Sequence, residues 1–270
     1  MPKPLSTLSI NQAKQIKWLL TDVDDTLTWE GKLPSETLLA LTKLNAAGVN
    51  IIPVTGACAG WCDQIARLWP VHGVIGENGA FWMKKNAQGF TSREMYPFEQ
   101  MKSRQSELMR QLDRLLEGYS GVSYAYDQAF RFCDVAINLS QDREPLSEKI
   151  CDELLNKICQ LSVDGERVNA ALSSIHLNVW VGNHSKRLTT EKYLLENNGI
   201  AAIKDNEIAY IGDSFNDESM FAWLPLTFGV KNILPILSKL TAKPAYLTDQ
   251  KGGYGFAELA EVILQAKKAS

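Results

Sequence analysis

The sequence contains few cysteines, and their spacing is not typical of disulfides or of a zinc site. There are five in 270 residues, an odd number, without a C-x-x-C pair or neighbouring histidine ligands. Cys58 and Cys62 are four residues apart, as are Ile65 and Trp69 further along the same predicted helix. Packing on one helix face explains this spacing better than zinc binding does. All five thiols are therefore expected to be reduced and structural.

Long apolar runs and clusters of basic residues are also missing. The apolar W-L-L near the N-terminus is followed at once by T-D-V-D-D, so no stretch there is long enough for a signal peptide or a membrane span. We therefore expect a cytoplasmic protein without a membrane partner. The chain has 28 basic and 31 acidic residues, a formal net charge of −3, and no run of Lys and Arg. Nucleic acid is consequently not an expected partner.

Apolar residues are plentiful, and one apolar stretch ends in a cluster of acids. Hydrophobic residues make up 45% of the chain, which suffices for the core of one large domain or two modest ones. The segment 16–28, I-K-W-L-L-T-D-V-D-D-T-L-T, is an apolar run that stops on Asp22, Asp24 and Asp25. It predicts a buried strand whose end carries a site, because ligands bind at that end of open α/β sheets.

The spacing of Asp22 and Asp24 suggests what this site binds. Along an extended segment the two side chains lie on the same side, with Val23 facing the other way. Two such carboxylates repel each other unless a cation lies between them or one keeps its proton. The pair therefore predicts a hard metal such as Mg²⁺, a shared proton, or both. A lone D-x-D would more often be only a turn or a helix N-cap.

Polar groups follow other predicted elements in the same way. Thr55 and Gly56 come after a predicted strand at 49–54, where a hydroxyl and a glycine amide can hold phosphate, although a threonine N-cap explains them equally well. Lys186 opens a predicted helix, which is unfavourable for the helix dipole unless the lysine meets an anion; a solvated lysine is the alternative.

A short predicted strand at 208–211 ends in G-D-S-F-N-D, which contains Asp213, Asn216 and Asp217. The glycine turn and the four-residue spacing place both carboxylates near the start of a helix, facing the other strand ends. As a single hexapeptide this motif is moderately specific. With D-x-D, Thr-Gly and Lys before it in order, it becomes a strong signal.

In this order the four stretches resemble the motifs of the haloacid dehalogenase (HAD) superfamily of phosphotransferases. That family has D-x-D-x-T-[LV] after the first strand, Ser or Thr after the second, then Lys, then G-D-x-x-N-D, and the resemblance covers nearly the whole chain. It implies that Asp22 attacks phosphorus and that Asp24 acts as general acid and base. It also implies that Lys186 binds the phosphate and neutralises the nucleophile.

Three positions depart from the family pattern. Asp25 stands where such sequences usually have Gly or Asn, and this adds a carboxylate near the site. Ala57 replaces the Arg that frequently follows Thr-Gly, so a substrate contact common in relatives is either missing or supplied from elsewhere. Arg187 replaces the Gly that mostly follows the motif lysine.

From about residue 97 the order of predicted helices and strands changes, which predicts a second structural unit. The expected elements are a helix at 98–117, strands at 122–126 and 131–139, a helix at 144–161, and strands at 167–173 and 175–181. This αββαββ order predicts one antiparallel sheet with helices on one face, and it resembles the type-IIB cap of HAD proteins. The expected fold is α/β, with a Rossmann-like parallel-sheet core (1–84 plus 184–270) and an inserted α+β cap (85–183).

The last cap strand is the candidate for substrate recognition. Alternation along I-H-L-N-V-W-V places His176, Asn178 and Trp180 on one face and the aliphatic residues on the other. Imidazole, amide and indole suit stacking on a polyol and hydrogen bonding to it. The alternative is that these three side chains simply face solvent. Asn178 also stands where similar proteins often have an acidic residue.

The resemblance implies a Mg²⁺-dependent phosphatase that acts on a small phosphorylated metabolite, with sugar phosphates as the expected class. In this scheme an aspartyl phosphate forms on Asp22, Mg²⁺ is held by Asp22, Asp213 and the Asp24 backbone carbonyl, and Asp217 orients Lys186 or a metal-bound water. The expected phosphate-binding residues are Thr55, Gly56, Lys186 and Asn216. Two alternatives are a phosphomutase resembling phosphomannomutase and a catalytically silent sugar-phosphate-binding protein. The expected oligomeric state is a monomer or a homodimer.

Overall fold

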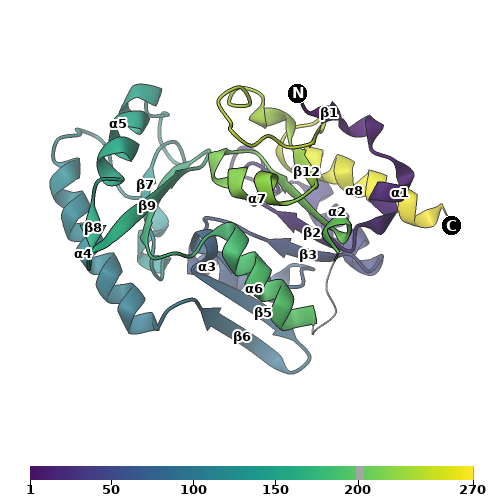
Figure 1. The fold of residues 1–270 in the computed structure, drawn as a ribbon, viewed down its shortest axis with the longest axis horizontal. Helices are drawn as coiled ribbons and strands as arrows, with labels where there is room; N and C mark the ends of the chain where they lie inside the picture. Colours follow the sequence, from purple (N-terminus) through teal and green to yellow (C-terminus); the bar gives the residue numbers. More distant parts are fainter. Residues whose placement is uncertain (199–203, 270) are drawn as a thin grey trace.

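The computed structural model describes residues 1–198 and 204–269, and a parallel β-sheet forms the centre of this part (Figure 1). Within it, six strands lie in the order β1-β13-β12-β11-β2-β3, and each neighbouring pair is parallel. Their bounds are Lys3–Pro4 (β1), Tyr246–Leu247 (β13), Leu226–Gly229 (β12), Ile208–Gly212 (β11), Trp18–Thr21 (β2) and Asn50–Pro53 (β3). The carboxyl ends of β2, β3 and β11 therefore meet at one edge of the sheet.

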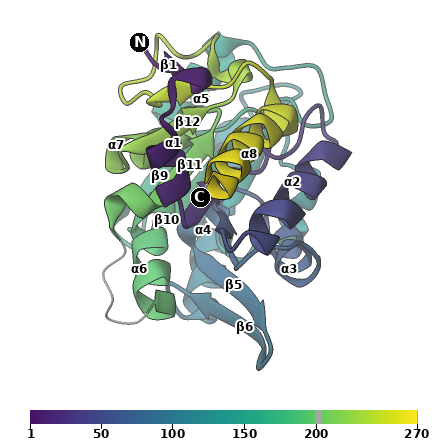
Figure 2. The same ribbon diagram turned by 90° about the vertical axis from the view of Figure 1, so that its right-hand side faces the viewer.

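Helices cover both faces of this sheet, which explains why β2, β11 and β12 are buried along their whole length. Along β2, Leu19 packs into one apolar cluster, whereas Trp18 and Leu20 pack into another. The first cluster includes side chains of α2, α3 and α8, and the second includes side chains of α6 and α7. Figure 2 shows α8 beside α1 and α2 on one side of the sheet. The helices of this core are Ile10–Gln15 (α1), Ser35–Ala46 (α2), Ala59–Leu68 (α3), Lys186–Asn198 (α6), Glu218–Trp223 (α7) and Gly252–Lys268 (α8).

A three-stranded antiparallel sheet extends the core beyond β3. It consists of Val74–Gly76 (β4), Phe81–Asn86 (β5) and Gly89–Glu94 (β6), in the order β4-β5-β6. Val54 and Ile75 form a parallel bridge that joins this sheet to the end of β3. Since β6 pairs with β5 along its whole length, we propose that the cap begins after β6 rather than at residue 85.

The cap is built on a separate antiparallel sheet, as Figure 1 shows. Its four strands lie in the order β7-β10-β9-β8, with bounds Val135–Asn138 (β7), His176–Val181 (β10), Glu166–Leu172 (β9) and Ser162–Val163 (β8). Helices α4 (Phe98–Leu116) and α5 (Glu148–Ile158) bury Leu108, Leu112 and Leu154 in one cluster with Leu177 and Val179 of β10. The expected fold class, a parallel-sheet core with an inserted cap, is confirmed.

The expected strand at 122–126 was wrong, and the one expected at 131–139 is shorter. Tyr124 forms only an isolated bridge with Ile137, and the chain then enters a 3-10 turn at Tyr126–Phe130 (η3). The second strand begins at Val135, because the backbone of residues 132–134 is hydrogen-bonded to a core side chain and not to a strand. The other 3-10 turns are Leu5–Thr7 (η1), Glu77–Gly79 (η2), Asp205–Glu207 (η4), Phe215–Asp217 (η5) and Lys231–Ile233 (η6).

Candidate active site

The ends of three neighbouring strands bring the acidic and hydroxyl side chains together. Asp22 directly follows β2, and its backbone N–H donates to the carbonyl of Ile211 in β11 at 2.9 Å. Asp213 directly follows β11, and Thr55 comes two residues after β3. The three side chains are buried. Register in the parallel sheet therefore places these chemically active groups at one edge.

Lys186, the first residue of α6, lies in the middle of this group and is 2% exposed. Its Nζ donates to Asp217 Oδ1 at 2.7 Å, to Asp22 Oδ1 at 2.9 Å and to Asn216 Oδ1 at 3.1 Å. Burial acts to lower the pKa of Lys186, but the ion pairs with Asp217 and Asp22 outweigh it and raise that pKa. The lysine is therefore a fixed, charged donor and not a solvated side chain.

Both oxygens of Asp217 already have several donors. Oδ2 accepts the backbone N–H of Asp213 at 2.9 Å and of Ser214 at 3.1 Å. Oδ1 accepts the Lys186 ammonium and the hydroxyl of Tyr210. Asp217 thus fixes the loop after β11 and aims Lys186 at Asp22.

The buried acids have a donor set that fits a hard divalent cation. Carboxylate oxygens of Asp22, Asp213 and Asp217 all lie within 4.8 Å of one another. Lys186 forms ion pairs with Asp22 and Asp217, and Asp213 has no ion pair among the described residues. Burial raises the pKa of Asp22 to about 7, and burial with the neighbouring carboxylates raises the pKa of Asp213 well above its ordinary value. A bound cation would relieve this repulsion, and Mg²⁺ prefers such oxygen ligands.

Asp22 and Asp213 are the two acids with room for such an ion. Asp213 accepts the hydroxyl of Thr26 at 3.1 Å and the amide of Asn232 at 3.3 Å, one on each oxygen. Oδ2 of Asp22 accepts no hydrogen bond from the residues that the structure describes, whereas Oδ1 is held by Lys186. Thr26 lies within the D-x-D-x-T pattern, yet sequence reasoning did not assign it a role.

Asp24 lies beside the buried acids but at the edge of a cavity, where it is partly exposed. Burial, and after it the neighbouring Asp25 carboxylate, raises the pKa of Asp24 to about 6. A carboxyl group with such a pKa can both give and take a proton near neutral pH. Asp25 has φ +55°, in the left-handed region, and its carbonyl accepts the amide of Asn232 at 3.0 Å. This conformation explains why Gly or Asn is usual there and why Asp is tolerated.

The Thr55–Gly56 turn lies under the cap. The hydroxyl of Thr55 accepts the N–H of Ala57 at 3.0 Å. Arg131, which belongs to the cap, donates from Nη1 to the Gly56 carbonyl at 2.9 Å. A guanidinium thus lies next to the second motif even though Ala57 has replaced the usual arginine. A Cβ atom on Gly56 would lie 3.0 Å from Oδ1 of Asn178, so the cap and this turn are closely packed.

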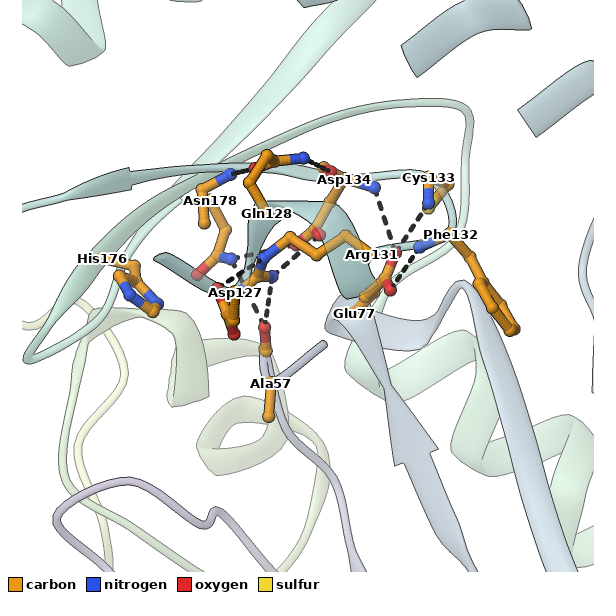
Figure 3. Close-up of polar contacts among 12 residues, drawn as sticks. Ala57, Glu77, Asp127, Gln128, Arg131, Phe132, Cys133, Asp134, His176 and Asn178 are labelled. Carbon is orange, nitrogen blue, oxygen red and sulfur yellow. Dashed lines mark hydrogen bonds and ion pairs between the residues drawn. The ribbon is translucent and has the colours of Figure 1, made fainter. Parts of the chain in front are cut away.

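A buried polar network joins the cap to the core at this turn, and Figure 3 shows it. Arg131 pairs with Asp134 at 2.8 Å and with Asp127 at 3.1 Å. Glu77 of the core accepts the backbone N–H groups of 132, 133 and 134 from the cap and that of Ala59 from α3. Sequence reasoning missed this network. The available signal was the pair of opposite charges at 131 and 134, inside the strand expected at 131–139.

The three cap residues expected to contact substrate are placed differently from one another. His176 lines the cavity next to Asp24, and its Nε2 lies 2.8 Å from Oε1 of Gln141. Asn178 instead donates to Asp134 Oδ2 at 2.9 Å. The indole N–H of Trp180 donates to the His184 carbonyl at 3.3 Å, and this side chain does not line the cavity.

The comparisons with known proteins agree with this architecture. No family model matches the chain. A phosphoglycolate phosphatase from Pyrobaculum aerophilum is 27% identical over 251 residues, which cover 92% of this chain and 96% of the relative. A haloacid dehalogenase-like hydrolase from Bacteroides thetaiotaomicron superposes with a TM-score of 0.64 at 17% identity, covering 92% of this chain and 99% of its own.

A third relative has the same fold at greater sequence distance. The C-terminal domain of trehalose-6-phosphate phosphatase from C. albicans superposes with a TM-score of 0.71 at 13% identity, and 98% of each chain is covered. Among the described residues, no helix combines the length and the apolar character needed to cross a membrane. The resemblance seen in the four motifs is confirmed: the protein has the fold of the haloacid dehalogenase-like hydrolases, with an inserted α/β cap.

Proposed function

We propose that this protein is a Mg²⁺-dependent phosphatase that hydrolyses a small phosphorylated metabolite, with sugar phosphates as the expected class. Its relative from P. aerophilum, named as a phosphoglycolate phosphatase, supports phosphoric monoester hydrolysis. The observation that carries the proposal is the state of Asp22. One of its oxygens is held by Lys186, while the other accepts no hydrogen bond from the described residues. Such a carboxylate is oriented and free to attack phosphorus.

In the first step, an Asp22 oxygen forms a bond to phosphorus while the bond from phosphorus to the ester oxygen breaks. Asp24 gives its proton to the leaving alkoxide. Lys186, Asn216 and the Thr55–Gly56 turn hold the oxygens of the transferring group. When bound, Mg²⁺ would be held by Asp22, Asp213 and the Asp24 carbonyl, and it would stabilise the charge on the phosphoryl oxygens.

The second step hydrolyses the aspartyl phosphate. Asp24, now ionised, takes a proton from water as the water oxygen bonds to phosphorus, and the bond from phosphorus to Asp22 breaks. Both carboxylates return to their starting states. Asp217 keeps Lys186 in place through both steps, because its Oδ1 accepts the ammonium while its Oδ2 is fixed by the backbone N–H groups of Asp213 and Ser214.

Two other functions use the same residues. A mutase resembling phosphomannomutase would pass the phosphoryl group to a second acceptor and would require a bisphosphorylated activator. A silent sugar-phosphate-binding protein would bind the ester without cleaving it. The intact set of Asp22, Asp24, Lys186 and Asp213 favours catalysis over silent binding.

Screening a panel of phosphorylated metabolites, with Mg²⁺ and with EDTA, tests the proposal. We expect phosphate release with Mg²⁺, loss of release with EDTA, and recovery when Mg²⁺ is restored. The nearly isosteric Asp22→Asn should lower kcat/KM on the order of 10⁴-fold or more while the fold stays intact. A variant activity within tenfold of the parent would remove Asp22 as the nucleophile.

A further inference from the structure

A cavity of about 650 Å³ opens beside Asp24 between the core and the cap. Asp24 and Asp25 line it from the core, and Asp127 and His176 line it from the cap. Helix α3 and the loop after β2 supply the remaining walls. Because Asp24 is the proposed proton donor to the leaving group, this cavity is where the leaving group of a substrate would lie.

The charged side chains that line the cavity are all acidic. They are Asp25, Glu30 and Asp127, together with Asp24, which carries a proton in the first step. Among the described residues that line the cavity there is neither lysine nor arginine. Arg131 lies behind Asp127 and is fully buried, with its donors turned to Asp127, Asp134 and the Gly56 carbonyl. A second negative charge on a substrate would therefore meet repulsion here without a compensating cation.

The basic side chains near the cavity do not neutralise its acidic lining. Burial, assisted by Arg131, lowers the pKa of His176 to about 4, so this imidazole is neutral at pH 7. Lys251 lies over the Trp29 ring, with its Nζ 5.2 Å from the ring centre, but it does not line the cavity. In an adjoining cavity of about 890 Å³, which shares Asp25 with the first, the lining lysine is Lys239. It is paired with Glu148 at 2.9 Å.

Large apolar side chains line another part of the cavity, and two of them are well exposed. Trp61 and Leu68 of α3 are 52% and 71% exposed, and Trp29, Leu33 and Trp69 complete this wall. Indole rings suit packing against the C–H face of a sugar ring. The carboxylates that line the same cavity accept hydrogen bonds, and the hydroxyl groups of a sugar can donate them.

We propose that the leaving group of the substrate is an uncharged, hydroxyl-rich sugar, and that the acidic lining selects against leaving groups that carry a carboxylate or a second phosphate. This inference rests on the proposed phosphatase function. It disfavours phosphoglycolate, the substrate in the name of the P. aerophilum relative, because the glycolate leaving group carries a carboxylate. It also disfavours the mutase, whose activator carries two phosphates.

The test measures kcat/KM of the full chain with Mg²⁺ on three kinds of substrate. They are monophosphates of uncharged hexoses and disaccharides, phosphoglycolate, and fructose 1,6-bisphosphate. p-Nitrophenyl phosphate serves as the reference for the chemical step. We expect kcat/KM for the best monophosphate of an uncharged sugar to exceed kcat/KM for phosphoglycolate and for the bisphosphate by tenfold or more. Better use of phosphoglycolate or the bisphosphate than of every neutral sugar phosphate would overturn the inference while the phosphatase function stands. If neither p-nitrophenyl phosphate nor any of the metabolite phosphates is hydrolysed, the proposed function fails, and the inference with it.

A charge added to the wall gives a second, independent readout. Gln64 is an exposed residue of α3 that lines the cavity. Gln64→Lys should raise the ratio of kcat/KM for phosphoglycolate to that for the best sugar phosphate by about tenfold. The control is Gln160→Lys, which places the same charge on an exposed cap residue outside the cavity. An equal ratio in both variants would contradict selection by the cavity's charge.

Discussion

At the scale of single residues, Asp22 and Asp24 have different surroundings, which support the different roles proposed for them. Asp22 is buried and held by Lys186, whereas Asp24 is partly exposed at the cavity. Both follow the end of β2, where the sequence placed the candidate site. The difference between their surroundings depends on Lys186, which contacts Asp22 and comes 164 residues after it in the chain.

Asp24→Asn tests the different roles proposed for the two acids. The variant cannot donate a proton, so hydrolysis of alkyl phosphates should fall by 10²-fold or more. Hydrolysis of an activated aryl phosphate should fall far less, because a nitrophenolate leaves without protonation. Steady-state kinetics on one ester of each type measure the two losses. Equal losses would mean that Asp24 acts mainly by positioning other groups.

At the scale of elements, the sequence predicted the parts that follow from local periodicity. Strands β2, β3 and β11 carry the motif residues at their ends, where parallel pairing brings them together. The contacts of Glu77 with residues 132–134 could not be predicted, because they join segments more than fifty residues apart that no repeat or alternation connects. They also explain why the second cap strand begins late.

Glu77→Gln tests the importance of that contact for the fold. Glu77 is fully buried, and its Oε2 accepts the backbone N–H groups of Cys133 and Asp134. In the variant an amide NH₂ group, which is itself a donor, takes the place of one carboxylate oxygen. Leaving buried donors without acceptors should lower the free energy of unfolding by about 3 kcal/mol in denaturant titrations. The control Asp63→Asn breaks a surface pair with Arg67 and should cost less than about 1 kcal/mol. Similar losses for both variants would contradict a cap-anchoring role of Glu77.

At the scale of the whole molecule, all three histidines lie in poorly solvated positions. Burial is the largest cause that lowers the pKa of His72, His176 and His184, each to about 4. In the unfolded chain these groups would titrate near pH 6.5. Their contribution to stability is therefore full above pH 6.5 and is lost as the pH falls toward about 4.

Titration of the imidazole NMR signals checks this prediction, since none of the three should titrate at pH 6 or above. His184→Gln provides the linked stability measurement. The parent should exceed the variant in unfolding free energy by more at pH 7 than at pH 5. A His184 signal that titrates near pH 6.5 would show that the imidazole is not desolvated by the cap and core.

The cap and core are also expected to act together around the candidate metal site. We propose that the cap, from after β6 to about residue 183, closes over Asp24 and excludes water from the cavity. Two contacts join the cap to the core in this arrangement. Arg131 donates to the Gly56 carbonyl, and Glu77 accepts backbone N–H groups of the cap. The sequence predicted two units from the change in element order. The proposed position of the first joint depends on the pairing of β5 with β6, which the structure provides.

The most direct measurement of the central claim is chemical trapping of the covalent intermediate. The protein is mixed with Mg²⁺ and a phosphate ester that it hydrolyses, then quenched with borohydride, which reduces an acyl phosphate to an alcohol. Mass spectrometry of the peptide that contains residue 22 should show homoserine in place of Asp22, and a sample without substrate should show Asp. Rapid turnover with Asp22 left unreduced, or with the reduced residue elsewhere, would contradict attack by Asp22.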